Sequence, residues 1–183
     1  MRYLIILLFT IQSFAQVSNK LPYYEIPESP EFYTPATTAA RMIDGLGFRY
    51  YWATQGLRAE DLAYKIGADS RTSGETVEHI YGLSKFIRNS VLTDNKDENK
   101  GELSFEAKRK QTLLNLKLVS EALKANNGNF GLASTEVPFW NIINGPVEDA
   151  VWHCGQVVML RRASGNPFTS NVSLFSGTVK DKN

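Results

Sequence analysis

The sequence predicts an all-α fold, an up-down four-helix bundle with an extended N-terminal arm. Three long segments repeat apolar residues at spacings of three and four, the pattern of helices that bury one face, and a fourth long helix is expected after Pro146. Residues suited to helix N-termini precede these segments, and no strand pattern competes with them apart from a weak run at 168–178. Because the links between the segments are short or moderate, we expect the helices to pack side by side.

The N-terminal part of this domain combines an arm with a first helix. Residues 16–33 carry three prolines among polar and aromatic residues, which favours an extended arm. Thr34 is suited to the N-cap and Pro35 to the first helical position, so a helix is expected to run from there to about Thr54. A short helix is expected at about 60–64.

The next two helices have clear start and stop signals. Thr72 and Glu75 have the spacing of a capping box and predict a helix over 73–91. The strongest helical pattern runs from Ser104 to about Ala125. The residues at 126–128, Asn-Asn-Gly, are typical of a helix end.

A loop is expected at 129–145, with its aromatic residues used for packing. Pro146 is suited to the first turn of a last helix that continues to about Ala163. The helical domain is therefore expected to cover 34–166, and residues 167–183 to form a C-terminal tail.

Composition narrows the classes of function. The 183 residues include 20 Lys and Arg against 19 Asp and Glu, with no long basic run, so binding to nucleic acid through phosphate neutralisation is not expected. The single cysteine excludes an internal disulfide and a cysteine-cluster metal site.

The first fifteen residues have the pattern of a secretory signal peptide. Arg2 is followed by an apolar run from Tyr3 to Ile11, and Ser13 and Ala15 are small residues at the positions that a signal peptidase reads. We expect cleavage after Ala15 and export to the periplasm or the cell exterior. The apolar run is too short for a stable membrane span.

The two histidines of the chain are the best candidates for chemistry. His153 shares one face of the last helix with Asp149 and Gln156, because residues three or four apart lie one turn from each other. His79 is on a face of the 73–91 helix that is expected to point inward. Two imidazoles and one carboxylate in a bundle core would suit a divalent metal ion such as Zn, Ni, Mn or Fe.

Plainer interpretations of the same residues stay open. An inward histidine is often a hydrogen-bonded core residue, and an acid such as Asp149 is favoured in a first helical turn by the helix dipole alone. Gln156 would orient a metal-binding side chain or a bound water by hydrogen-bonding to it without touching the ion. Alternatively, it is a buried amide that satisfies backbone groups. Cys154 lies about 100° round the helix from His153 and is expected to pack between helices.

The last helix resembles that of the DinB-like (DinB/YfiT) family of four-helix-bundle proteins, whose pattern is His-x-x-x-His-Arg-Gly-Gln followed by Leu-Arg and Gly. The resemblance spans roughly 34–166. Two positions depart from the pattern, because Asp149 replaces the first His and Cys154 replaces the Arg. The matching positions are His153, Gly155-Gln156, Leu160-Arg161 and Gly165 in the last helix, Glu78-His79-Ile80 in the second, and Tyr50 to Thr54 with Asp61-Leu62 around the end of the first.

The resemblance implies a metal-dependent enzyme, a hydrolase or a thiol-cofactor transferase, with the ion held by His79, Asp149 and His153. Export argues against the transferase, since small thiols are mainly cytoplasmic. One alternative is a non-catalytic periplasmic protein that binds a metal or a small ligand in the same pocket. Another is a structural or partner-binding module with both histidines in its core. A homodimer through exposed helix faces is compatible with all three, and the expected partner is a small molecule.

Overall fold

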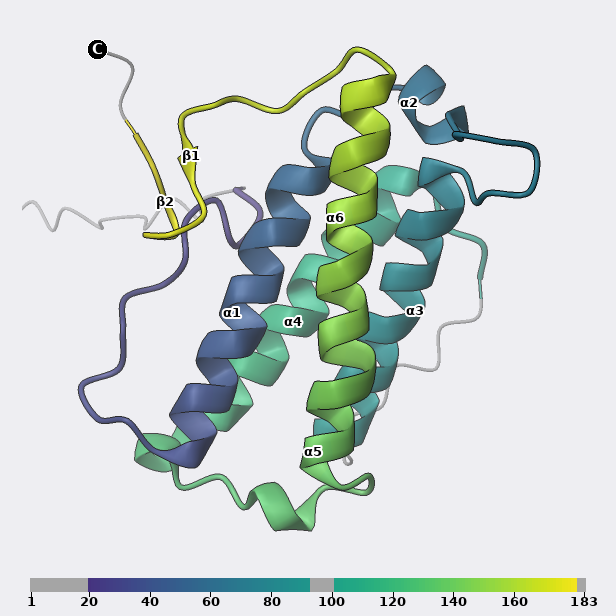
Figure 1. Cartoon of the computed structure of the whole chain (residues 1–183). Helices are drawn as coiled ribbons and strands as arrows, with labels where there is room; N and C mark the ends of the chain where they lie inside the picture. Colours follow the sequence, from purple (N-terminus) through teal and green to yellow (C-terminus); the bar gives the residue numbers. More distant parts are fainter. Residues whose placement is uncertain (1–19, 93–100, 181–183) are drawn as a thin grey trace, which may run out of the picture.

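Four long helices make up most of the computed structural model, which describes residues 20–92 and 101–180. They are α1 (Pro35–Thr54), α3 (Ser73–Val91), α4 (Phe105–Gly128) and α6 (Glu148–Ala163). α1 and α3 each pack against both α4 and α6 (Figure 1). The prediction of an all-α fold is confirmed, because the only strands described are the two-residue β1 (Val172–Ser173) and β2 (Thr178–Val179), which pair antiparallel.

The expected signal peptide at 1–15 lies outside the described residues, as do residues 16–19 of the expected arm. Among the residues that are described, no helix is long and apolar enough to cross a membrane.

The helix starts agree with the capping signals. Thr34 accepts a hydrogen bond from the backbone of Thr37, and Thr72 and Glu75 form the expected capping box. Ser104 caps α4 in the same way. Regular geometry in α4 is lost from Ala125 onward, and the two asparagines that follow have positive φ, as their position in a helix-stop signal predicts.

The prediction that helix direction alternates along the chain is wrong. Thr34, before α1, donates a hydrogen bond to the carbonyl of Gly128 at the end of α4, so these two helices are antiparallel. Asn115 of α4 donates to Ser84 of α3, and Lys108 of α4 forms an ion pair with Glu78 of α3, so α3 and α4 are parallel.

The length of one link explains this order of directions. α3 is about 28 Å long, from its 19 residues. Residues 92–104 could span about 40 Å when extended, so the chain is long enough to return to the other end of the domain before α4 begins. The apolar periodicity of each helix is the same for either direction, and therefore did not distinguish them.

The predicted loop at 129–145 is wrong in its second half. After a 3₁₀ turn, η1 (Leu132–Ser134), α5 (Phe139–Ile142) and a π-helical turn, η2 (Ile143–Val147), lead without a break into α6. Pro146 therefore lies inside a helical run. A wide π turn is one way to accommodate a residue that has no N–H to donate.

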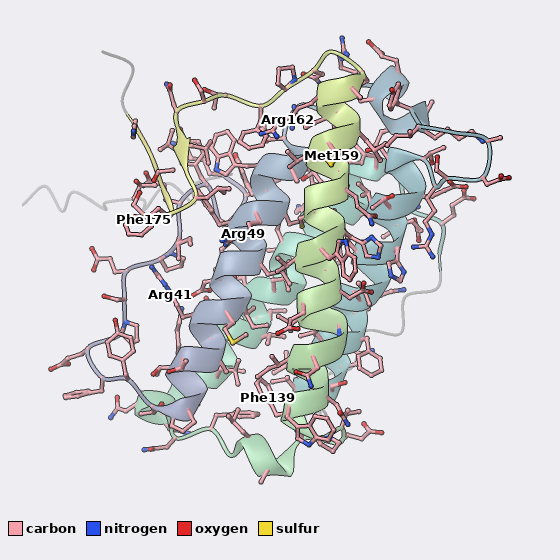
Figure 2. All side chains as sticks on the ribbon, in the orientation of Figure 1. Arg41, Arg49, Phe139, Met159, Arg162 and Phe175 are labelled. Atoms are coloured by element: carbon pink, nitrogen blue, oxygen red, sulfur yellow. The ribbon has the colours of Figure 1, made fainter. Side chains whose placement is uncertain are left out.

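The two aromatic residues at the start of α5 have different surroundings. Phe139, labelled at the lower end of the molecule in Figure 2, is buried. The Trp140 side chain is 64% exposed, so the expectation that it packs is not met.

The described part of the arm, residues 20–33, contains no helix or strand and includes a turn at 22–25, and it lies beside α1 and the C-terminal hairpin (Figure 1). Tyr23 is buried against Gly47, where an added Cβ would come within 2.5 Å of the ring. The backbone N–H of Ile26 donates to the carbonyl of Gly177 in the hairpin at 2.8 Å. The arm thus joins the first helix to the end of the chain.

Two buried arginines donate hydrogen bonds to backbone carbonyls at the C-terminal end of α1. The last carbonyls of a helix have no partners within the helix. Nη1 of Arg161, at the end of α6, donates to the carbonyls of Trp52 and Ala53, both at 3.0 Å. Nη2 of Arg109, near the start of α4, donates to the carbonyl of Tyr51. Both guanidinium groups face the negative end of the helix dipole, so they stabilise it while they hold two neighbouring helices.

A second polar network joins α2 (Ala59–Ala63) to the end of α6. The carboxylate of Asp61 is fully buried and accepts two hydrogen bonds from the Arg58 guanidinium, at 2.9 and 2.8 Å. Ser164 and Asn166 each donate to the same carboxylate at 2.6 Å. The hydrogen bonds from Arg58, followed by those from Ser164 and Asn166, hold the pKa of the Asp61 carboxyl well below its usual range.

We expect Arg161→Met to lower the free energy of unfolding by about 2–4 kcal/mol, because buried helix-end carbonyls would lose their charged donor. The matched control is Arg162→Met, which removes an exposed neighbour and should change stability by less than about 0.5 kcal/mol. Urea unfolding followed by circular dichroism measures both. Equal effects of the two substitutions would contradict the role given to Arg161.

We also expect Asp61 to contribute to acid sensitivity. A carboxyl with a lowered native pKa stabilises the fold above its unfolded-state pKa, near 3.9, and this contribution is lost as the pH falls. Between about pH 6 and about pH 3, the wild type should therefore lose about 1 kcal/mol more stability than Asp61→Asn. Urea midpoints at the two pH values test this, and parallel losses in the two proteins would refute it.

Candidate metal centre

The three residues proposed as ligands come together between α3 and α6. Nε2 of His79 lies 3.1 Å from Oδ2 of Asp149, and Nε2 of His153 lies 3.2 Å from Oδ1 of the same carboxylate. The two imidazole rings meet edge to face with their centroids 4.7 Å apart. One donor atom from each residue lies within 4.8 Å of the other two, so the three residues form one group.

Packing of the two helices explains this convergence. Asp149 and His153 are four apart on α6 and project from successive turns. His79 lies on the turn of α3 that faces them, and the two helices are in direct contact. Glu75, one turn before His79, is held by the capping box and does not reach the group.

The group is more open than the sequence predicted. The side chains of His79 and Asp149 are 36% and 40% exposed, whereas that of His153 is 13% exposed. It therefore lies in a groove at the surface of the helical domain, not in its core. The inward face of α3 is formed instead by residues such as Val77 and Ile80, which are buried.

Gln156 contacts the ring nitrogen of His153 that does not face Asp149. Its Oε1 lies 2.7 Å from Nδ1 of His153, and with the amide in this orientation Nδ1 donates the hydrogen. In the neutral ring, Nε2 then presents a lone pair toward Oδ1 of Asp149. Two acceptors this close repel each other unless a cation, either a proton or a metal ion, lies between them. Gln156 is exposed, so the alternative of a buried amide is not met, and its role in orienting His153 stays a prediction.

The donor set fits a divalent ion. In a tetrahedral site with bonds of about 2.1 Å, neighbouring ligand atoms are about 3.4 Å apart. Each histidine lies near that distance from a different oxygen of Asp149, 3.1 Å from Oδ2 for His79 and 3.2 Å from Oδ1 for His153, and one ligand atom from each residue lies within 4.8 Å of the other two. Two imidazoles and one carboxylate on one side of an ion leave its other side open to a ligand.

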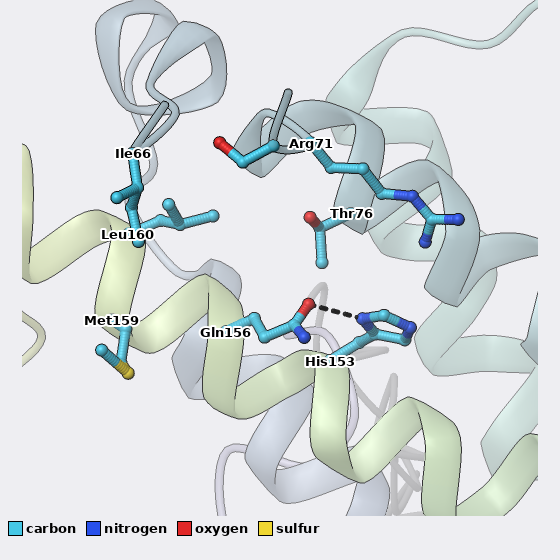
Figure 3. Close-up of a pocket in the computed structure, with 8 residues that line it drawn as sticks. Ile66, Arg71, Thr76, His153, Gln156, Met159 and Leu160 are labelled. Atoms are coloured by element: carbon cyan, nitrogen blue, oxygen red, sulfur yellow. Dashed lines mark hydrogen bonds between the residues drawn. The ribbon is translucent and has the colours of Figure 1, made fainter. Parts of the chain in front are cut away.

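Two hollows lie on either side of the group. A cavity of about 430 Å³ includes His153 and Gln156 of α6, Thr76 of α3 and Arg71 just before α3 (Figure 3). A second, of about 640 Å³, includes Asp149 and the exposed side chain of Trp152. No motif in the sequence marks Arg71 and Thr76, because only the packing of α3 on α6 places them in the same cavity as His153.

Cys154 packs between helices, as predicted. It is buried, and burial raises the pKa of its thiol to about 12. The thiol is therefore neither a metal ligand nor a ready nucleophile in the folded chain.

We expect the native protein to react with a disulfide reagent such as Ellman's reagent at least about a hundredfold more slowly than the urea-unfolded protein does. In the folded chain the Cys154 thiol is buried and little of it is ionised, so the reagent reaches few reactive thiolates. The chain has one cysteine, so the colour change reports this position alone. Rapid reaction of the folded protein would contradict the burial of Cys154.

Comparisons with known proteins do not add to this geometry. Models of protein families, curated proteins and solved structures were all compared with the chain, and none matches.

Proposed function

We propose that this chain is an exported, DinB-like four-helix-bundle protein and a divalent-metal-dependent enzyme that acts on a small molecule. The observation that carries the proposal is the arrangement around Asp149. Two imidazoles converge on this carboxylate, at 3.1 and 3.2 Å, so two nitrogen ligands and one oxygen ligand suited to a divalent ion lie together. The resemblance of the last helix to the DinB-like pattern adds support.

His79, Asp149 and His153 would hold the ion, and Gln156 would keep His153 in the tautomer that binds it. A divalent ion at this place would polarise an electrophilic substrate and activate a nucleophile. Arg71, which lines the neighbouring cavity, would bind an anionic or carbonyl group of that substrate, and the Thr76 side chain would contact it. The expected export favours hydrolysis over thiol transfer, because small thiols are mainly cytoplasmic.

The second candidate is a protein that binds a metal and a small ligand without catalysis. The cavity of about 430 Å³ favours it, because no carboxylate is among its lining residues in the described part of the chain. His153 is the one base there, and it would be occupied by the ion. A hydrolase would then have to recruit a base from outside the lining residues.

The first test is metal content. Residues 16–183 are incubated separately with Zn, Ni, Mn and Fe(II), desalted and subjected to elemental analysis. We expect about one ion per chain, lost in His79→Ala and Asp149→Ala because each removes a ligand. Glu148→Ala, which removes the adjacent exposed acid of the same helical turn, is the matched control and should keep the ion.

A further variant tests whether Gln156 holds the His153 ring for metal binding. Gln156→Leu should keep the site but weaken metal affinity by about 10–100-fold, because His153 loses the partner of Nδ1. A competitive chelator titration measures this. Failure of the wild type to retain any of the four ions, or equal retention by all variants, would overturn the metal site and favour a structural or partner-binding module.

The metal-loaded wild type then separates the two candidates. Turnover of ester, amide or phosphoester substrates that disappears in Asp149→Ala would support the enzyme. Ligand binding that requires the ion, without turnover, would support the binding protein.

A further inference from the structure

A further hollow, separate from the two beside the metal group, lies on the face of α6 opposite His153. At about 100° per residue, Val151, Gly155, Val158 and Arg162 lie roughly half a turn from His153. They line a cavity of about 320 Å³ between α6 and α1. Apolar and aromatic side chains form most of its wall, among them Trp52 of α1 and two residues of the C-terminal tail, Phe168 and Leu174.

The hollow continues along the same pair of helices. A second cavity, also of about 320 Å³, lies beside the first and shares Arg49 and Val151 with it. Figure 2 shows Arg162, Arg49 and Arg41 one after another along this side of the molecule. Together the two cavities form an elongated, mainly apolar groove, which we call the α1–α6 groove.

The three arginines of the groove, Arg41, Arg49 and Arg162, have no acidic partner among the described residues. Glu148 is the one carboxylate among the described lining residues of the two cavities. Arg49, from α1, is half-buried and donates to the carbonyl of Gly45 within its own helix at 3.0 Å. Arg162 is exposed, and its guanidinium lies 6.0 Å from the centre of the Phe168 ring. The guanidinium of Arg49 therefore has N–H donors left over that an anion in the groove would accept from.

The C-terminal hairpin covers one end of this groove and is itself held in place. The backbone N–H of Val179 donates to Oε1 of Glu25 in the arm at 2.9 Å, and that of Ile26 donates to Gly177. Leu174, in the turn between the strands, therefore reaches the groove from a segment with fixed contacts.

We propose that the α1–α6 groove binds an amphipathic anion, a free fatty acid whose tail lies on the apolar wall and whose carboxylate meets Arg49 and Arg162. The size suits a small ligand, since ligand pockets usually measure about 300–1,000 Å³ and combine apolar walls with a few polar groups. Charge complementarity favours the carboxylate, because the cavity lined by Arg49 and Arg162 has no acidic residue in its described lining, whereas Glu148 lines only the neighbouring cavity. This site is separate from the metal group and does not depend on it.

Gly155 offers a way to fill the groove without removing a contact. A Cβ added there would meet no atom within 4 Å, so a larger side chain would extend into the cavity. Leucine is a better helix former than glycine, and Gly155→Leu should therefore fold. Gly82 in α3 is also exposed with free space around it, so Gly82→Leu is the matched control.

The test is binding of decanoate to residues 16–183, measured by calorimetry and by displacement of the fluorescent amphipathic anion anilinonaphthalene sulfonate. Gly155→Leu should weaken decanoate binding more than tenfold, while Gly82→Leu leaves it unchanged. Arg49→Gln and Arg162→Gln should each weaken it about tenfold, the size expected for one charge-assisted hydrogen bond. Lys110→Gln, which removes an exposed cation of α4, controls for net charge.

Two further measurements decide between the proposal and its rivals. Asp149→Ala should bind decanoate as the wild type does, which separates this site from the metal group. Decan-1-ol should bind more weakly than decanoate, and equal affinities would overturn the role of the arginines. Binding to phosphatidylglycerol vesicles without any binding of free decanoate would overturn the fatty-acid site in favour of a lipid headgroup. Absence of binding in the wild type would also refute it.

Discussion

The carbonyls at the C-terminal end of α1 set the main constraint on this fold. A helix end buried in a protein needs donors from outside the helix, and here the donors are two guanidinium groups from different helices. Arg109 brings the start of α4 to this point, and Arg161 brings the end of α6. Because Arg161 is near the end of α6, its contact with the end of α1 requires these two helices to run parallel. Because Arg109 is near the start of α4, its contact requires α1 and α4 to run antiparallel.

The position of α6 in turn decides what lies beside its histidine. With Arg161 held at the end of α1 and Ser164 bonded to Asp61, the earlier turns of α6 pass along α3. Asp149 then lies within 3.1 Å of His79, a residue 70 positions earlier in the chain. The site is therefore a product of helix alignment, and its openness follows from its place at the surface between two helices.

The two faces of α6 have different chemistry because the helix lies between two partners. Toward α3 it presents Asp149, His153 and Gln156, which suit a cation. Toward α1 it presents valines, a glycine and an arginine, which suit an apolar ligand with a negative end. Met159 lines hollows on both sides and separates them. Such a helix cannot be recognised by one apolar stripe, because neither of these faces is simply core.

Local signals in the sequence by themselves determined the helices, their caps and the spacing of Asp149 from His153. These properties depend on residues within a few positions of each other, as in the capping box of Thr72 and Glu75. Only the tertiary structure decided that α3 and α4 are parallel, that the π turn carries Pro146 into the last helix, and that Arg71 lies beside His153. Those outcomes depend on packing between distant segments. An apolar periodicity predicts which face of a helix is buried, but it does not predict the direction of the helix or the element against which that face packs.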